Sequence, residues 1–117
     1  MTAARLLIAA LALAALVPPA GAKPKPAYIG DWALNAADCK TEDYAVSTTA
    51  TTFDTFDATC KMRDVKGGRG VWRAKIKCVG EAAGTGADEI TLRANAKRLI
   101  FEYRSSPGER YEVVRCK

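Results

Sequence analysis

The chain has 117 residues, a formal net charge of +5 and no histidine. Without histidine it lacks the usual base for a serine nucleophile and the commonest metal ligand, and pairing of its four cysteines would exclude thiol catalysis as well. Carboxylate pairs could still act as acid and base, but no spacing singles out such a pair. We therefore expect a protein that is not an enzyme and that needs no cofactor.

The N-terminus has the features of a secretion signal. Arg5 supplies a positive charge, and residues 6–17 form an apolar run too short to span a bilayer comfortably. The sequence Ala20-Gly21-Ala22 then has the small-x-small pattern of a cleavage site. We expect residues 1–22 to be removed, which leaves no stable membrane anchor and a periplasmic or secreted protein.

The remainder is expected to be a single domain, residues 28–117, behind a short leader. Residues 23–27 are rich in lysine and proline, which favour an extended, flexible segment. Residues 28–34 alternate in polarity and predict a first strand, with Trp32 and Leu34 on the same face.

The next segments predict a turn and two short strands. Residues 35–42 are polar and turn-like, and Asp38 could cap a single helical turn. Residues 43–57 interleave hydroxyl and aromatic side chains, which favours two strands that turn near Thr49-Ala50.

Residues 60–79 predict a hairpin that turns at Gly67-Gly68-Arg69-Gly70. Apolar and cationic residues alternate on both sides of this turn. The apolar faces of the two strands coincide only if the numbers of the residues paired across the hairpin add up to an even value, such as 138. A sum of 138 sets Cys60 opposite Cys78. The outer face would then carry a cluster of cations: Lys61, Arg63, Arg73, Lys75 and Lys77.

The C-terminal part predicts a surface loop and three further strands. The loop covers residues 80–87, two strands within residues 90–103 turn near Asn95-Ala96, and residues 111–116 form the last strand. The total is seven or eight short strands, an all-β antiparallel meander. Because a closed or nearly closed barrel removes exposed edges, we expect the last strand to lie beside the first.

Four cysteines in an exported chain predict two stabilising disulfides, and they include no C-x2-C pair typical of a metal site. We favour the pairing of Cys39 with Cys60 and of Cys78 with Cys116, because these bridges tie the irregular segment and the C-terminus to the central strands. The alternative, which follows from the hairpin register, joins Cys60 to Cys78 and Cys39 to Cys116.

Gly30-Asp31-Trp32 in the first strand and Arg115 in the last resemble the Gly-x-Trp signature of lipocalin-like (calycin) barrels. The resemblance implies that Trp32 plugs one barrel end and that Arg115 packs over its ring in a cation–π contact. The outline is also similar to that of small periplasmic barrels that inhibit secreted metalloproteases, in which a cysteine after this strand bridges to a later one. Cys39 and Cys60 have the corresponding places.

The predicted function is an exported protein-binding or inhibitor-type module. One alternative is a small carrier of an apolar ligand, which requires an internal cavity. A second is a binder of anionic envelope components through the cationic hairpin face, because like charges placed opposite each other cost stability unless they meet an anion. That face could equally be a solvated surface that limits aggregation, and nucleic acid is not an expected partner.

Overall fold

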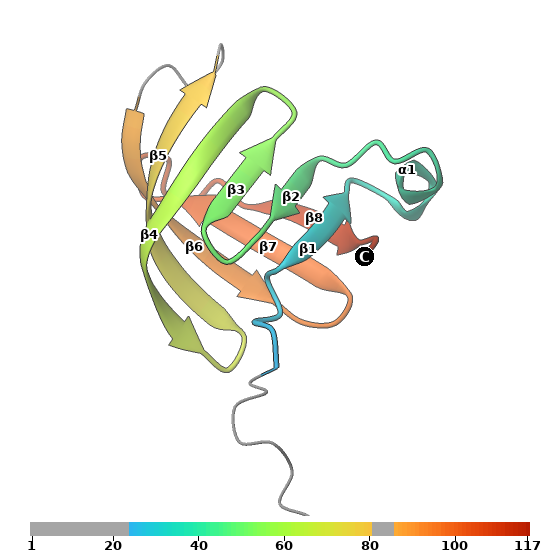
Figure 1. Ribbon diagram of the computed structural model, residues 1–117, viewed down its shortest axis with the longest axis horizontal. Helices are drawn as coiled ribbons and strands as arrows, with labels where there is room; N and C mark the ends of the chain where they lie inside the picture. The colour runs from blue at the N-terminus through green and yellow to red at the C-terminus, as the bar shows by residue number, and fades with distance from the viewer. Residues whose placement is uncertain (1–23, 81–85) are drawn as a thin grey trace, which may run out of the picture.

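The computed structural model describes residues 24–80 and 86–117, and these form a closed barrel of eight antiparallel strands in chain order (Figure 1). The predicted all-β meander is confirmed, with the last strand paired to the first. The predicted signal peptide, residues 1–22, lies outside the described residues, as does most of the predicted loop. The elements are β1 (Gly30–Ala33), α1 (Ala36–Lys40), β2 (Val46–Thr48), β3 (Thr52–Thr55), β4 (Ala58–Gly68), β5 (Val71–Gly80), β6 (Gly86–Ala94), β7 (Arg98–Tyr103) and β8 (Tyr111–Arg115).

The long hairpin β4–β5 has the predicted register over its first half. Cys60 lies opposite Cys78 and Met62 opposite Ile76, so the buried sides of the two strands coincide. The register then shifts by one residue between Arg63 and Lys66, as a β-bulge does. The turn itself is shorter than predicted, because the strands continue until only Arg69 and Gly70 remain between them. Both have positive φ, as a two-residue hairpin turn requires.

The favoured disulfide pairing is wrong, and the alternative is the one found. Cys60 is joined to Cys78, with their Cα atoms 4.0 Å apart, and Cys39 to Cys116, with their Cα atoms 5.2 Å apart. The hairpin register decides the first bridge, because the two cysteines are direct cross-strand partners on the inner face. The second follows from barrel closure, which brings α1 beside the end of β8.

Two local expectations after β1 also fail. Asn35, and not Asp38, caps the short helix, since its Oδ1 accepts a hydrogen bond of 3.0 Å from the Asp38 backbone N–H. β1 ends at Ala33, so Leu34 does not continue the buried face and its side chain is 70% exposed. Leu34 instead lies at the rim of the barrel.

Large side chains fill the end of the barrel at which the chain enters β1. Trp32 is fully buried, and its indole N–H donates to the Tyr28 carbonyl over 3.1 Å. The Tyr28 ring contacts Trp72 edge to face, with ring centres 5.1 Å apart. Trp72 is therefore a core residue, as its position in the alternating pattern predicts.

Candidate ligand-binding site

Arg115 seals the end of the barrel that holds Trp32. Its guanidinium carbon lies 4.2 Å from the centre of the Trp32 ring, which is the cation–π contact that the lipocalin resemblance implied. Gly30 makes this approach possible, because a Cβ at that position would lie 2.8 Å from Nη1 of Arg115. The guanidinium also donates hydrogen bonds to four backbone carbonyls, those of Ala27, Ile29, Asn95 and Ala96.

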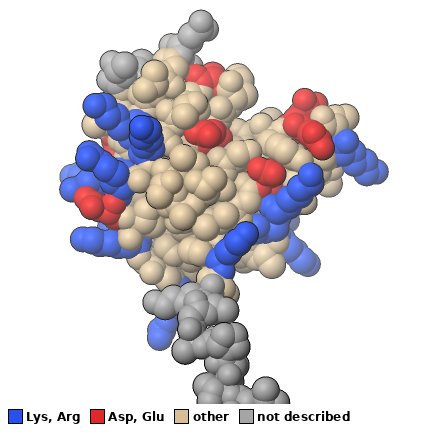
Figure 2. Space-filling view, in the orientation of Figure 1, with Lys and Arg blue, Asp and Glu red and all other residues tan. Residues whose placement is uncertain are grey.

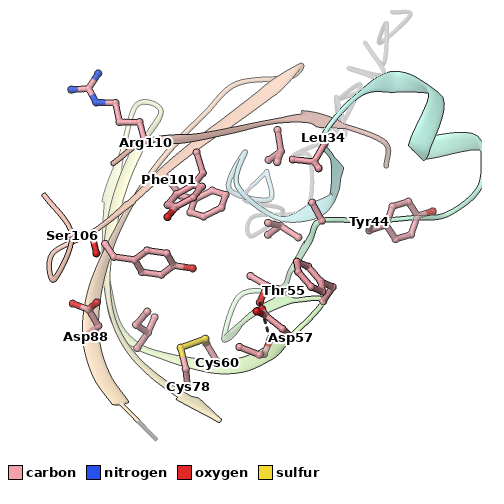
Figure 3. A pocket seen from close by; sticks show the side chains of 18 of the residues that line it. Leu34, Tyr44, Thr55, Asp57, Cys60, Cys78, Asp88, Phe101, Ser106 and Arg110 are labelled. Atoms are coloured by element: carbon pink, nitrogen blue, oxygen red, sulfur yellow. Dashed lines mark hydrogen bonds between the residues drawn. A yellow bond between two sulfur atoms is a disulfide. The ribbon is translucent and has the colours of Figure 1, made fainter. Parts of the chain in front are cut away.

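The opposite end of the barrel is open and hollow, with a cavity of about 1050 Å³ (Figure 3). Its wall includes the buried disulfide between Cys60 and Cys78, together with inward-facing side chains of β5, β7 and β8. Small residues at inward positions near the mouth leave the space unfilled, among them Ala58 and Gly86, whereas tryptophans fill the other end. The barrel is thus a cup with a packed base.

Aromatic rings form one side of the cup. Phe101 stacks on Tyr111, with ring centres 5.1 Å apart and planes 17° apart, and Tyr103 meets Phe101 edge to face at 5.9 Å. Phe53 supports these rings from the core, 5.1 Å from Phe101. Because each ring is held by its neighbours, this wall presents apolar surface without having to become ordered when a ligand binds.

The mouth of the cup is rich in carboxylates. Asp57 lies in the turn between β3 and β4, and Asp88 lies on β6, where it pairs with Ile76 in the β5–β6 ladder. Burial, together with the charges of Tyr111, Asp57 and Asp88, raises the pKa of Tyr103 to about 12. Among the described residues, the acidic side chains that line the cavity are Asp38, Asp43, Asp57, Asp88 and Glu112.

The mouth carboxylates hydrogen bond mainly to neutral groups. Asp57 accepts a bond of 2.8 Å from the hydroxyl of Thr55. Asp88 accepts bonds from the hydroxyl and backbone N–H of Ser105 and from the backbone N–H of Glu89. These bonds fix the two carboxylates at the rim without neutralising them.

The predicted cationic cluster lies elsewhere, on the exposed outer face of β4 and β5 (Figure 2). The cross-strand partners are as predicted for two pairs, Lys61 with Lys77 and Arg63 with Lys75, while Arg73 pairs with Lys66 after the bulge. This face is not purely cationic. Lys75 lies 3.5 Å from a carboxylate oxygen of Asp64 and opposite Glu89 of β6. None of the five predicted site residues lines the cup.

Sequence reasoning therefore missed the residues of the cup. Alternation placed Phe101 and Tyr103 on the inner face, and an inner face is ordinarily core. The sequence does offer one signal, because two inward positions toward the end of the barrel opposite Trp32 hold small residues, Ala58 and Gly86.

Comparison of the chain with protein-family models, with curated proteins and with solved structures found no match. No helix in residues 24–80 and 86–117 has the length and apolar character needed to cross a membrane. Within the same ranges, no three His, Cys, Asp or Glu side chains are grouped so that they could hold a metal ion.

Proposed function

We propose that this protein is an exported, non-enzymatic binding module that takes up an apolar molecule through the open end of its barrel. The observation that carries the proposal is the cup of about 1050 Å³, walled by aromatic and aliphatic side chains above a sealed base. Small-molecule sites are typically concave, largely apolar and about 300 to 1,000 Å³ in volume. The volume of the cup is slightly above this range.

Composition supports binding over catalysis. The chain has no histidine, and its four cysteines are paired, so no thiol or imidazole lines the cup. The two disulfides are compatible with an extracellular or periplasmic location, which agrees with the signal-like sequence of residues 1–22. A carrier that works outside the cytoplasm fits these features.

A second candidate is the protein-binding or inhibitor-type module expected from the sequence. It is favoured by apolar side chains exposed around the mouth, since Phe56 is 89% exposed and Leu34 is 70% exposed. Exposed apolar patches often mark protein interfaces. Here the partner would rest on the rim, and the cup would accept one protruding side chain.

The carrier proposal is tested by filling the cup. Ala58 lies on the inner face of β4 and lines the cavity, whereas its neighbour Thr59 is exposed on the outer face. We expect the neutral dye N-phenyl-1-naphthylamine to bind the wild type and Thr59→Trp with enhanced fluorescence, and to bind Ala58→Trp at least about tenfold more weakly. Equal binding by both variants would place the dye outside the cup and refute the proposal.

A rim substitution, Phe56→Ser, compared with Ala58→Trp separates the two candidates. If the protein holds a partner protein on its rim, Phe56→Ser abolishes capture of that partner from the envelope fraction, and Ala58→Trp has a smaller effect. If it is a carrier, Ala58→Trp is the variant that loses the bound molecule.

A further inference from the structure

We infer that the molecule bound in the cup is an amphipathic cation, whose apolar body enters the barrel and whose positive group stays at the mouth. This inference rests on the proposed function and adds the charge of the ligand.

Negative charge predominates at the mouth. Among the described residues that line the cavity, five carry a carboxylate and one, Arg110, carries a cation. The Arg110 guanidinium extends away from the cup (Figure 3) and lies 3.7 Å from Glu102. Glu112 pairs with Arg98 at 2.8 Å. The aspartates at the mouth have no such ion pair with a lysine or arginine in the described part of the chain: Asp38, Asp43, Asp57 and Asp88.

The negative charge of the mouth acts inside the cup. Burial opposes ionisation of the Tyr103 hydroxyl most strongly, and Asp57 in the β3–β4 turn and Asp88 on β6 both add to this effect. The same field that disfavours a phenolate favours a cation at that place. Low-dielectric walls around the mouth strengthen the field relative to that of carboxylates on an open surface.

Aromatic surface lies next to the carboxylates. Tyr103 and Tyr111 have ring centres 6.1 Å apart and both line the cavity, and Phe56 adds an exposed ring at the rim. A cation within about 6 Å of a ring centre is attracted by the ring quadrupole. Carboxylates together with aromatic rings are suited to an ammonium group and repel a carboxylate or sulfate.

The net charge of the whole molecule is opposite in sign to the charge of the mouth. The chain carries a formal charge of +5, and a dense group of its cations lies over β4 and β5, on the outside of the barrel (Figure 2). Non-specific attraction would therefore favour anionic ligands. A measured preference for cationic ligands would therefore arise from the charges at the mouth and not from the net charge of the protein.

The test uses two amphiphiles with the same tail, decyltrimethylammonium and decyl sulfate, both below their micelle concentrations. Each displaces N-phenyl-1-naphthylamine from the protein with intact disulfides. We expect decyltrimethylammonium to displace the dye at a concentration at least about tenfold lower, and its affinity to fall as sodium chloride is raised because salt screens the rim carboxylates.

Substitutions of selected carboxylates show which part of the protein causes the preference for the cationic amphiphile. Asp57→Asn combined with Asp88→Asn should reduce the cation preference to about threefold or less, since the two mouth carboxylates that act on Tyr103 lose their charge. Asp64→Asn, with Asp64 beside Lys75 on the outer face, is the matched control for loss of a carboxylate and should leave the preference unchanged. If the double variant does not fold, the salt dependence of the wild type decides the question in its place.

The outcomes separate the two proposals. If the dye binds in the cup and both amphiphiles displace it equally, or if the sulfate is preferred, the inferred cation is refuted while the carrier function stands. If neither the dye nor any amphiphile binds, the carrier function itself is refuted.

Discussion

Trp32 and Arg115 are direct cross-strand partners where β1 meets β8, and this pair closes the barrel. The indole is fully buried, and the guanidinium lies over its ring while donating to carbonyls of the chain before β1 and of the turn between β6 and β7. One side chain thus joins segments that are up to 88 residues apart in sequence.

Replacing Arg115 should destabilise the folded protein. Arg115→Met keeps much of the apolar stem but removes the cation and leaves four carbonyls without their donor. We expect the free energy of unfolding in urea to fall by about 2 to 4 kcal/mol, because hydrogen bonds to charged groups are among the stronger ones.

The control for that measurement is Arg104→Met. Arg104 pairs with Glu89 on the surface, and its side chain is 81% exposed. Its removal should cost less than about 1 kcal/mol. Similar losses for the two variants would show that Arg115 does not hold the barrel closed.

Alternation along the strands accounts for much of what the sequence predicts about the fold. The even register of the central hairpin follows from Cys60 and Met62 on one strand and Ile76 and Cys78 on the other. Burying both sets on one face restricts the register to even sums, among which the sum of 138 is the one found. The bulge after Arg63 could not be foreseen in this way, because an inserted residue preserves the pattern on each side of it.

The cup could not be predicted from alternation, because the pattern gives the direction of a side chain and not what it meets across the barrel. Phe101 and Trp72 both point inward, yet the first lines a cavity and the second packs against Tyr28. The difference depends on the volumes of side chains on strands distant in sequence. The cations of β4 and β5 are predicted as a site because the alternating pattern within each strand is enough to show that they face outward.

The disulfide pairing is open to direct measurement. Trypsin cleaves after Lys40, Lys61, Lys77 and Arg115, which puts the four cysteines on four different peptides. Non-reducing mass spectrometry should find Cys39 linked to Cys116, and Cys60 linked to Cys78. A peptide that joins Cys39 to Cys60 would contradict the structure.

The two bridges should differ in their effect on stability. Cys39 and Cys116 are 77 residues apart, and Cys60 and Cys78 are 18 apart. From the reduced entropy of the cross-linked unfolded chain alone, we expect the first bridge to stabilise the fold by about 4.5 kcal/mol and the second by about 3 kcal/mol. We expect Cys39→Ser/Cys116→Ser to unfold at markedly lower urea concentration than the wild type. An unchanged midpoint would mean that this bridge does not restrain the unfolded chain.

Tyr103 gives the protein a defined response to alkaline pH. Its pKa of about 12 in the folded state lies above the value of 10.0 of an unperturbed tyrosine. Between these values the unfolded chain has already released the proton that the folded chain retains. The associated stability is therefore complete below pH 10 and is lost as the pH rises toward 12. Ultraviolet titration should show a late tyrosine that is missing in Tyr103→Phe, and this variant should lose less stability between pH 10 and 12.

The outer face of the hairpin allows a test of charge pairing with two matched substitutions. Lys77 faces Lys61 on β4 and Ala87 on β6, so Lys77→Glu should raise the free energy of unfolding by about 0.2 to 1 kcal/mol. Lys75→Glu should lower it by a smaller amount, because the repulsion from Asp64 and Glu89 outweighs the new attraction to Arg63, the cross-strand partner on β4. Urea unfolding at low salt measures both changes, and the same sign for both would contradict the observed register.

The cationic face also predicts how the protein behaves on an anionic matrix. Changing Arg63, Lys75 and Lys77 to glutamate reverses three neighbouring charges and should abolish salt-sensitive retention on heparin, because binding of this kind depends on local charge density. The control reverses the same number of exposed charges at dispersed positions, Lys25, Lys40 and Lys97, and should lower the elution salt concentration only modestly. Equal losses for the two triple variants would mean that net charge governs retention and that the β4–β5 face is a solvated surface. A loss confined to the hairpin variant would establish this face as a second binding surface, separate from the cup.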